Sequence, residues 1–169
     1  MRMAIAHKAG ETVVLDLLRE HRPPFSPEGV VAEYASTIKN YRCSQIFGDR
    51  YAGEWVVEQF RKHGVHYEPS ERSRSELYLD LLPLINSRGV ALLDNERMMF
   101  QMVALERTSI RGGGRDRVDH PKGSHDDLAN AAAGALVLAH TAVGYSPAQR
   151  AKDNLMLAEA YKRFAKSVA

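Results

Sequence analysis

Cysteine is almost absent from this chain of 169 residues. The single Cys43 excludes an internal disulfide and a cysteine-rich zinc site, and it fits a reducing compartment. No apolar stretch is long enough to cross a membrane, and the first residues lack the apolar core of a signal peptide. An excess of one charge is missing too, because the formal net charge is only +2. Any contact with nucleic acid must therefore come from a local basic patch.

Common catalytic and nucleotide-binding motifs are also missing. The triple glycine at 112–114 lacks the lysine and the strand–helix context of a phosphate-binding loop. No Walker motif is present, so we expect no ATPase activity from this chain. No serine-centred nucleophile elbow is present either. Cys43 has no adjacent base in the sequence, which argues against a nucleophilic role.

What is present is the pattern of an α/β fold with a mixed sheet and helices on its faces. Ser26 precedes Pro27 and predicts a helix start, while Pro83 predicts a kink or an early end in a later helix. The expected strands are 3–6, 12–18, 43–47, 65–68 and 90–94, with a second hairpin formed by 105–110 and 115–118. The expected helices are 27–40, 55–60, 73–86, 95–102 and an alanine-rich helix that starts near 127.

The chain length predicts one domain, which we place at 1–142. The remaining residues, 143–169, begin with Ser146 and Pro147 and then carry apolar residues at helical spacing. We therefore expect a separate amphipathic helix at the C-terminus.

Two adjacent carboxylates, Asp126 and Asp127, stand where the alanine-rich helix begins. Acids at a helix start can be simple caps, because the free N–H groups and the macrodipole favour negative charge there. They can also be metal ligands at the edge of an active site. His125 directly precedes them and could contact a phosphate or a metal-bound water, although a capping or supporting role explains it equally well.

Asp49 is the third acid of interest, because it follows the expected strand 43–47 at its carboxyl end. Ligands of open α/β sheets gather at such ends. A helix-capping role explains Asp49 equally well when this segment is taken alone. Together with Asp126 and Asp127, however, it would form a repulsive group of carboxylates unless divalent cations neutralised it. Oxygen ligands favour Mg²⁺ or Mn²⁺, and two such ions can hydrolyse a phosphodiester.

The hairpin before the acid pair is locally basic. Its charges come from Arg107, Arg111, Arg115 and Arg117. These residues could lie on a phosphate backbone. An exposed hairpin with solvated charges is the equally simple alternative.

Two segments of the chain resemble a known family when taken in this order. They are the run from Gly48 to Trp55, which contains Asp49 and Arg50, and the run from Ser124 to Ala131. Over most of the chain, from about Met3 to Ala142, the sequence resembles the nuclease domain of the large terminase subunit of tailed bacteriophages.

This resemblance implies an RNase H-like fold and a two-metal endonuclease that cuts viral DNA during packaging. Asp49 and Asp126 match two of the family's catalytic acids, and Asp127 could substitute or assist. The family's first catalytic acid lies on a central first strand that would precede Met1. The resemblance therefore implies a truncated fold without that strand, and weak or absent activity. The sheet could close by pairing the first hairpin with the strand at 43–47, a partner chain could donate a strand, or the domain could be a marginally stable prophage remnant.

The same resemblance implies double-stranded DNA as the substrate, with Arg50 and the hairpin arginines as DNA contacts. Other terminase subunits, the portal or a second copy of the chain are the implied protein partners, no membrane is involved, and the expected location is the bacterial host cytoplasm. Two alternatives remain open. One is a non-catalytic module that binds DNA or packaging partners, and the other is a different RNase H-like enzyme such as a resolvase or a transposase core.

Overall fold

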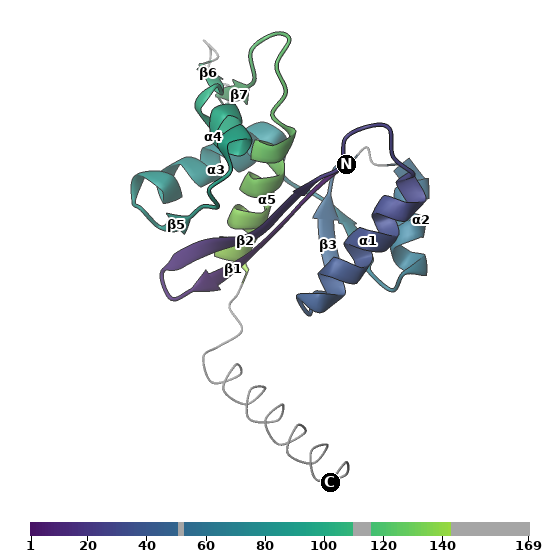
Figure 1. Cartoon of the computed structure of the whole chain (residues 1–169). Helices are drawn as coiled ribbons and strands as arrows, with labels where there is room; N and C mark the ends of the chain where they lie inside the picture. Colours follow the sequence, from purple (N-terminus) through teal and green to yellow (C-terminus); the bar gives the residue numbers. More distant parts are fainter. Residues whose placement is uncertain (51–52, 110–115, 143–169) are drawn as a thin grey trace.

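The structure is a computed structural model that describes residues 1–50, 53–109 and 116–142. Within these residues, strands and helices alternate between an initial pair of strands and a second pair, β6 and β7, which precedes the last helix (Figure 1). In chain order the elements are β1 (Arg2–Ala9), β2 (Thr12–Glu20), α1 (Pro27–Asn40), β3 (Gln45–Gly48), α2 (Gly53–Lys62), β4 (His66–Pro69), α3 (Arg74–Asn86), β5 (Val90–Ala91), α4 (Glu96–Val103), β6 (Glu106–Thr108), β7 (Arg117–Asp119) and α5 (Asp127–Thr141).

The first two strands form the predicted antiparallel hairpin, and it is longer than the apolar runs suggested. The register shifts between Ile5 and Ala6, where Leu17 and Leu15 are their partners and Asp16 is the extra residue of a bulge. Side chains alternate between the two faces of a strand, and a bulge changes that phase. As a result, Leu15 faces one apolar cluster and Leu17 the other.

The hairpin separates these two clusters, so the domain has helices on both faces of the strands (Figure 1). On one side, α5 packs on β1 and β2, where its alanines allow a close approach to the strands, and α3 and α4 pack against α5. On the other side, α1 presents Val31, Tyr34 and Ile38 to Met3 of β1. Ile46 of β3 packs against the same cluster, so α1 spans the hairpin and the next pair of strands.

The strands fall into separate sheets rather than one continuous sheet. The order β1-β2-β5 forms one sheet, the parallel pair β3-β4 forms another, and the hairpin β6-β7 forms a third. Within the described residues, β1 pairs only with β2 and β3 pairs only with β4. The hairpin therefore does not close the fold by pairing directly with β3, which was one of the expected outcomes. Among the described residues, no strand pairs with both β1 and β3.

Several elements differ from the pattern in the sequence. We expected a buried strand at β3, but Phe47 is 49% exposed, because side chains alternate between the two faces of a strand and Ile46, not Phe47, faces the cluster under α1. Only Val90 and Ala91 of the expected strand 90–94 form a ladder. Pro83 does not end α3 early, because the helix continues to Asn86.

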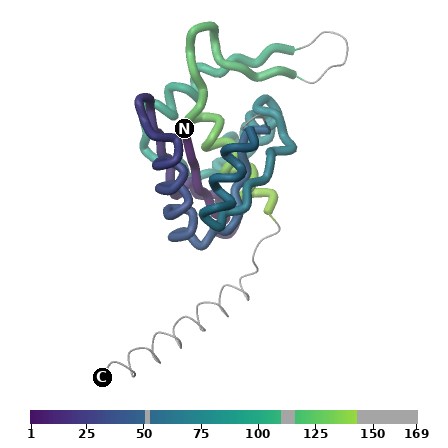
Figure 2. Tube along the Cα trace, turned by 90° about the vertical axis from the view of Figure 1, so that its right-hand side faces the viewer, coloured from purple at the N-terminus to yellow at the C-terminus, as the bar shows by residue number. Residues whose placement is uncertain are grey.

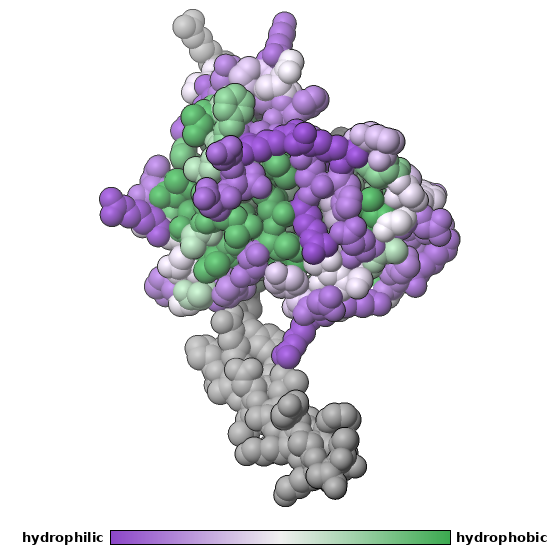
Figure 3. All heavy atoms as spheres, viewed as in Figure 1, coloured by the Kyte–Doolittle hydropathy of each residue, from purple (hydrophilic) through white to green (hydrophobic). Residues whose placement is uncertain are grey.

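The second hairpin, β6–β7, forms as predicted and extends away from the body of the domain (Figure 2). Apolar side chains also gather on the face shown in Figure 3. Phe100 and Val103 of α4 are largely exposed. None of the helices in the described ranges is long and apolar enough to span a bilayer. The C-terminal helix expected at 143–169 lies outside the described residues.

Candidate functional site

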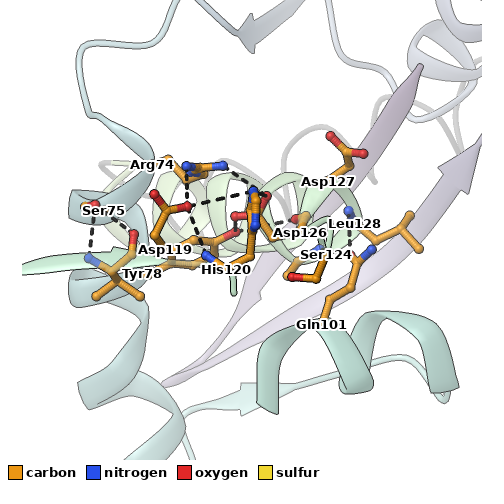
Figure 4. A network of polar contacts seen from close by, with 12 residues as sticks. Arg74, Ser75, Tyr78, Gln101, Asp119, His120, Ser124, Asp126, Asp127 and Leu128 are labelled. Carbon is orange, nitrogen blue, oxygen red and sulfur yellow. Dashed lines mark hydrogen bonds and ion pairs between the residues drawn. The ribbon is translucent and has the colours of Figure 1, made fainter. Parts of the chain in front are cut away.

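Asp126 is a buried carboxylate at the start of α5, with 4% of the residue exposed. Its Oδ1 accepts a hydrogen bond from Arg74 Nη1 at 3.1 Å, and its Oδ2 accepts one from the Tyr78 hydroxyl at 2.8 Å (Figure 4). Both partners come from the first turns of α3. A buried charge is tolerated only when it is paired and hydrogen-bonded, and both conditions are met here. The contacts of Asp126 therefore join α5 to α3.

The same arginine extends the network to β7. Arg74 Nη2 donates to Asp119 Oδ1 at 2.6 Å, and His120 Nε2 lies 3.9 Å from an oxygen of each aspartate. A hydrogen bond from Arg117, followed by one from the His120 backbone, holds the pKa of Asp119 below its ordinary value. Burial and the hydrogen bond to Asp126 raise the pKa of Tyr78, so this phenol stays protonated and donates.

The N–H groups at the start of α5 are capped by a residue that the sequence did not indicate. Asp126 occupies the N-cap position but makes no capping hydrogen bond with its side chain. Instead, Oε1 of Gln101 on α4 accepts from the backbone N–H groups of Leu128 at 2.9 Å and Ala129 at 3.1 Å (Figure 4). The capping reading of Asp126 is therefore wrong, because its side chain contacts α3 instead, while the metal-ligand reading stays a prediction.

Asp127 points away from that network (Figure 4). Its side chain is 43% exposed, and Oδ2 forms an ion pair with Arg2 Nη2 of β1 at 3.1 Å. Arg2 also contacts Glu20 of β2, which places Asp127 beside the ends of both hairpin strands. Of the two adjacent acids, Asp127 is thus the one open to a ligand.

Asp49 follows β3, as expected, and is exposed. Its backbone oxygen accepts a hydrogen bond from the Tyr67 hydroxyl of β4 at 2.9 Å. Burial, and then the nearby Asp49 carboxylate, raise the pKa of Tyr67 to about 12. A hollow of about 510 Å³ lies beside Asp49, bounded by Arg50, by Tyr67 and by Glu54 and Glu58 of α2. Asp127 is not among the residues that line it.

The predicted metal ligands do not form one complete site. Across the described ranges, no three His, Cys, Asp or Glu side chains are close enough to hold a metal ion. Asp126 and Asp127 are neighbours that point in different directions, and Asp49 lies at the end of a different sheet. His125 is exposed, and its ring lies 6.5 Å from that of His120 between centroids.

The described members of the predicted DNA-contact set already have protein partners. Arg50 donates to the backbone oxygens of Ser70 and Glu71. Arg107 pairs with Asp116, and Arg117 pairs with Asp119. Arg111 and Arg115 lie outside the described residues.

Several residues of the site were missed in the sequence because their partners are distant along the chain. Arg74 and Tyr78 are separated from Asp126 by 52 and 48 positions, and Gln101 is separated from Leu128 by 27. The one usable local signal was the Ser73 capping box, which fixes the helix start directly before Arg74.

Neither a protein-family profile nor a curated protein sequence matches this chain. Solved structures do match it, and they define the class of fold as RNase H-like. The nuclease of the large terminase from thermophilic phage G20c has a TM-score of 0.61 at 16% identity, over 79% of this chain and 81% of its own. The magnesium-bound form of that nuclease has a TM-score of 0.60. The large terminase nuclease domain of Thermus phage P74-26 has a TM-score of 0.61 at 17% identity, over 86% and 83%. The chain thus has the fold of the nuclease domain of phage large terminases.

Proposed function

We propose that this chain is the nuclease-type domain of a phage DNA-packaging terminase and that it acts on double-stranded DNA. The observation that carries the proposal is the shared fold, which covers about four-fifths of the chain and of each terminase nuclease. The two motifs of the resemblance support it, because Asp49 ends β3 and the acid pair opens α5. Both Asp49 and Asp127 are accessible to solvent.

The cofactor in this proposal is Mg²⁺ or Mn²⁺, because the candidate ligands are carboxylate oxygens. The G20c nuclease has been crystallised with bound cobalt and with bound magnesium. Among the described residues, no three candidate ligands lie together, so we propose that the metal site is incomplete in this chain. We therefore propose that the chain alone has weak or no nuclease activity. In this proposal Asp49 and Asp127 are the ligands it contributes, His125 assists, and Asp126 holds α5 in place.

Completion of the site requires a strand between β1 and β3 in this proposal. Both strands have one edge without a ladder partner among the described residues, and free strand edges accept an added strand readily. We propose that another polypeptide of the packaging machinery supplies this strand, with a second copy of the chain as the competing donor. The host cytoplasm, where packaging takes place in the family, is the proposed location.

Nicking of supercoiled plasmid DNA in Mn²⁺ tests the nuclease assignment. We expect slow nicking at most by the wild-type chain, and none by the Asp127→Ala and Asp49→Ala variants. Arg72→Ala is the matched control, because Arg72 pairs with Asp80 on the surface and with no other acid among the described residues. Equal nicking by all four proteins would show contamination or an unrelated site, and would contradict the proposal.

The second candidate is a non-catalytic module that binds DNA. The observation in its favour is the incomplete ligand set. It predicts that DNA binding does not depend on divalent ions and that nicking is absent even when the missing strand is supplied. A resolvase-like or transposase-like enzyme predicts selective cutting of branched DNA instead.

A further inference from the structure

Three arginines converge on one carboxylate beside Asp127. Oε2 of Glu20, at the end of β2, accepts from Arg22 Nε at 2.9 Å and from Arg97 Nη1 at 2.8 Å. Oε1 of the same residue accepts from Arg2 Nε at 3.1 Å, and Arg2 Nη2 lies 3.0 Å away. These four residues, which we call the Glu20 cluster, come from β1, β2, the loop after β2 and α4.

The Glu20 cluster has more positive charge than the carboxylate of Glu20 and that of the neighbouring Asp127 can balance. Three guanidinium groups face two carboxylates, those of Glu20 and Asp127, which leaves one positive charge in excess. The Glu20 side chain is only 12% exposed, whereas Arg22 is 63% and Arg97 35% exposed. The excess charge therefore lies on the solvent side of the cluster.

The unused hydrogen-bond donors of the arginines also indicate that the cluster can bind an anion. A guanidinium group has five N–H donors. Among the described residues, Arg22 and Arg97 each contact only Glu20, and each uses one nitrogen for it. Their other donors are available to an anion with several acceptor oxygens, and paired guanidinium donors suit a phosphate group.

The position of the cluster relates this anion to the candidate site. Arg2 Nη2 contacts both Glu20 and Asp127, so a member of the cluster pairs directly with the accessible acid at the start of α5. The N-terminal end of α5 adds the positive end of its dipole on the same side. Figure 3 shows hydrophilic side chains crossing the middle of the face that lies between α4 and α1.

We propose that Arg22 and Arg97, supported by Arg2, bind a phosphodiester group of the DNA backbone next to Asp127. This inference rests on the proposed function and specifies the surface that holds the substrate. The cluster differs from the β6–β7 hairpin, where Arg107 and Arg117 are each balanced by an aspartate of the same hairpin. The Glu20 cluster thus contacts the DNA beside the acid pair, in place of the hairpin residues described here.

Fluorescence anisotropy with a short labelled duplex in Ca²⁺ tests this assignment, with the full chain and a salt titration. We expect Arg22→Ala and Arg97→Ala each to weaken binding about 5-fold. Each should also lower the slope of log K against log salt by about 1, as the loss of one phosphate contact requires. Arg19→Ala is the matched control, because Arg19 is the neighbour of Glu20 but pairs with Glu33 of α1. We expect Arg19→Ala to bind as the wild type does.

A variant that removes a negative charge from the cluster distinguishes a role in DNA binding from a structural role. Glu20→Gln raises the excess charge of the cluster while it keeps an acceptor oxygen for the arginines. We expect it to bind DNA more tightly than the wild type, even if it lowers the melting temperature. Arg97→Lys keeps the positive charge, and it can be measured in case Arg97→Ala does not fold. It should retain most of the salt slope.

The outcomes distinguish the two proposals. If the wild type binds DNA, and the Arg22 and Arg97 variants bind equally well with an unchanged salt slope, the inference is overturned and the proposed function stands. Weaker binding by Glu20→Gln in a folded protein would also overturn the inference. If the wild type binds no DNA at any salt concentration, the proposed function itself fails.

Discussion

Asp126 and Asp127 are consecutive residues with opposite surroundings. Asp126 is enclosed by Arg74 and Tyr78, whereas Asp127 lies in solvent beside Arg2. Consecutive residues at a helix start project about 100° apart, so a pair of acids there can serve two purposes at once. The carboxylate that contributes most to stability is therefore a different residue from the one that is accessible for chemistry.

The two acids should differ sharply in their effect on folding. Removal of Asp126 leaves the Tyr78 hydroxyl and one donor of Arg74 without their partner in a buried position. We expect Asp126→Ala to lower the free energy of unfolding by about 3 kcal/mol. Asp127→Ala breaks an exposed ion pair and should cost less than about 1 kcal/mol. Urea denaturation followed by circular dichroism measures both, and equal losses would refute this division of roles.

Acid should weaken the fold partly through Glu20. Burial acts to raise the pKa of Glu20, but the hydrogen bonds from Arg22 and Arg2 outweigh it, so the pKa lies below its ordinary value of 4.5. A carboxyl with a lowered folded-state pKa contributes stability that is complete above the unfolded pKa and is lost as the pH falls through the folded pKa.

We therefore expect wild-type stability to decline as the pH falls from about 5 to about 3. Glu20→Gln should be less stable at pH 7 and should decline less steeply over that range. Asp119, whose pKa is also lowered, contributes to the remaining decline in both proteins. Chemical denaturation at a series of pH values measures the two slopes, and parallel slopes would contradict the role given to Glu20.

Among the elements, those defined by local signals were predicted well. Ser26 caps α1 through a hydrogen bond from the Gly29 N–H, and Ser73 caps α3 in a capping box with Glu76. Such signals act within four residues, and the sequence contains all of their parts. The hairpin β1–β2 was predicted for the same reason, although its bulge at Asp16 was not.

Elements that depend on distant partners were predicted less well. The strand at β3 was expected to be buried, but burial of Phe47 would need packing on the face opposite Ile46, which depends on distant parts of the chain. The site followed the same rule. The positions of Asp49 after β3 and of the acid pair at the start of α5 were predicted from local signals, while Arg74, Gln101 and the Glu20 cluster depend on contacts across the fold.

Gly48 offers a test of how β3 and β4 support Asp49. A Cβ atom at this position would overlap the phenol ring of Tyr67, which donates its hydroxyl to the Asp49 backbone. We expect Gly48→Ala to lower the free energy of unfolding by about 2 kcal/mol through this steric conflict. Gly29→Ala in α1 is the control, because its Cβ would make only ordinary contacts and should be neutral or slightly stabilising. Thermal melts of both variants decide the comparison.

At the scale of the whole molecule, the sheets β1-β2-β5 and β3-β4 both pack against α1, but no hydrogen-bonded ladder joins them within the described residues. The cluster under α1 includes Met3 of β1 and Ile46 of β3, so apolar packing holds the two sheets on one scaffold. The domain can therefore keep its overall architecture while the strand edges of β1 and β3 stay unpaired within the described residues. The fold with these unpaired edges matches the terminase nucleases over about four-fifths of their length.

Hydrogen exchange should report this arrangement directly. We expect amides of β2, which lies between β1 and β5, to exchange more slowly than those of β3, which has one ladder partner. Exchange measured by mass spectrometry at low protein concentration checks the order. Protection of β3 that rises with protein concentration would identify a second copy as the strand donor, and protection equal to β2 at all concentrations would contradict an open edge.

Gln101 has a consequence for how this domain can diverge. Because an uncharged side chain from α4 satisfies the first N–H groups of α5, neither aspartate is committed to that task. A lineage that lost the acceptor at position 101 would have to recruit one of the two aspartates as a cap. It would then give up either the link to α3 or the accessible acid. Drift at a residue remote from the chemistry would in this way decide which substitutions the acid pair can tolerate.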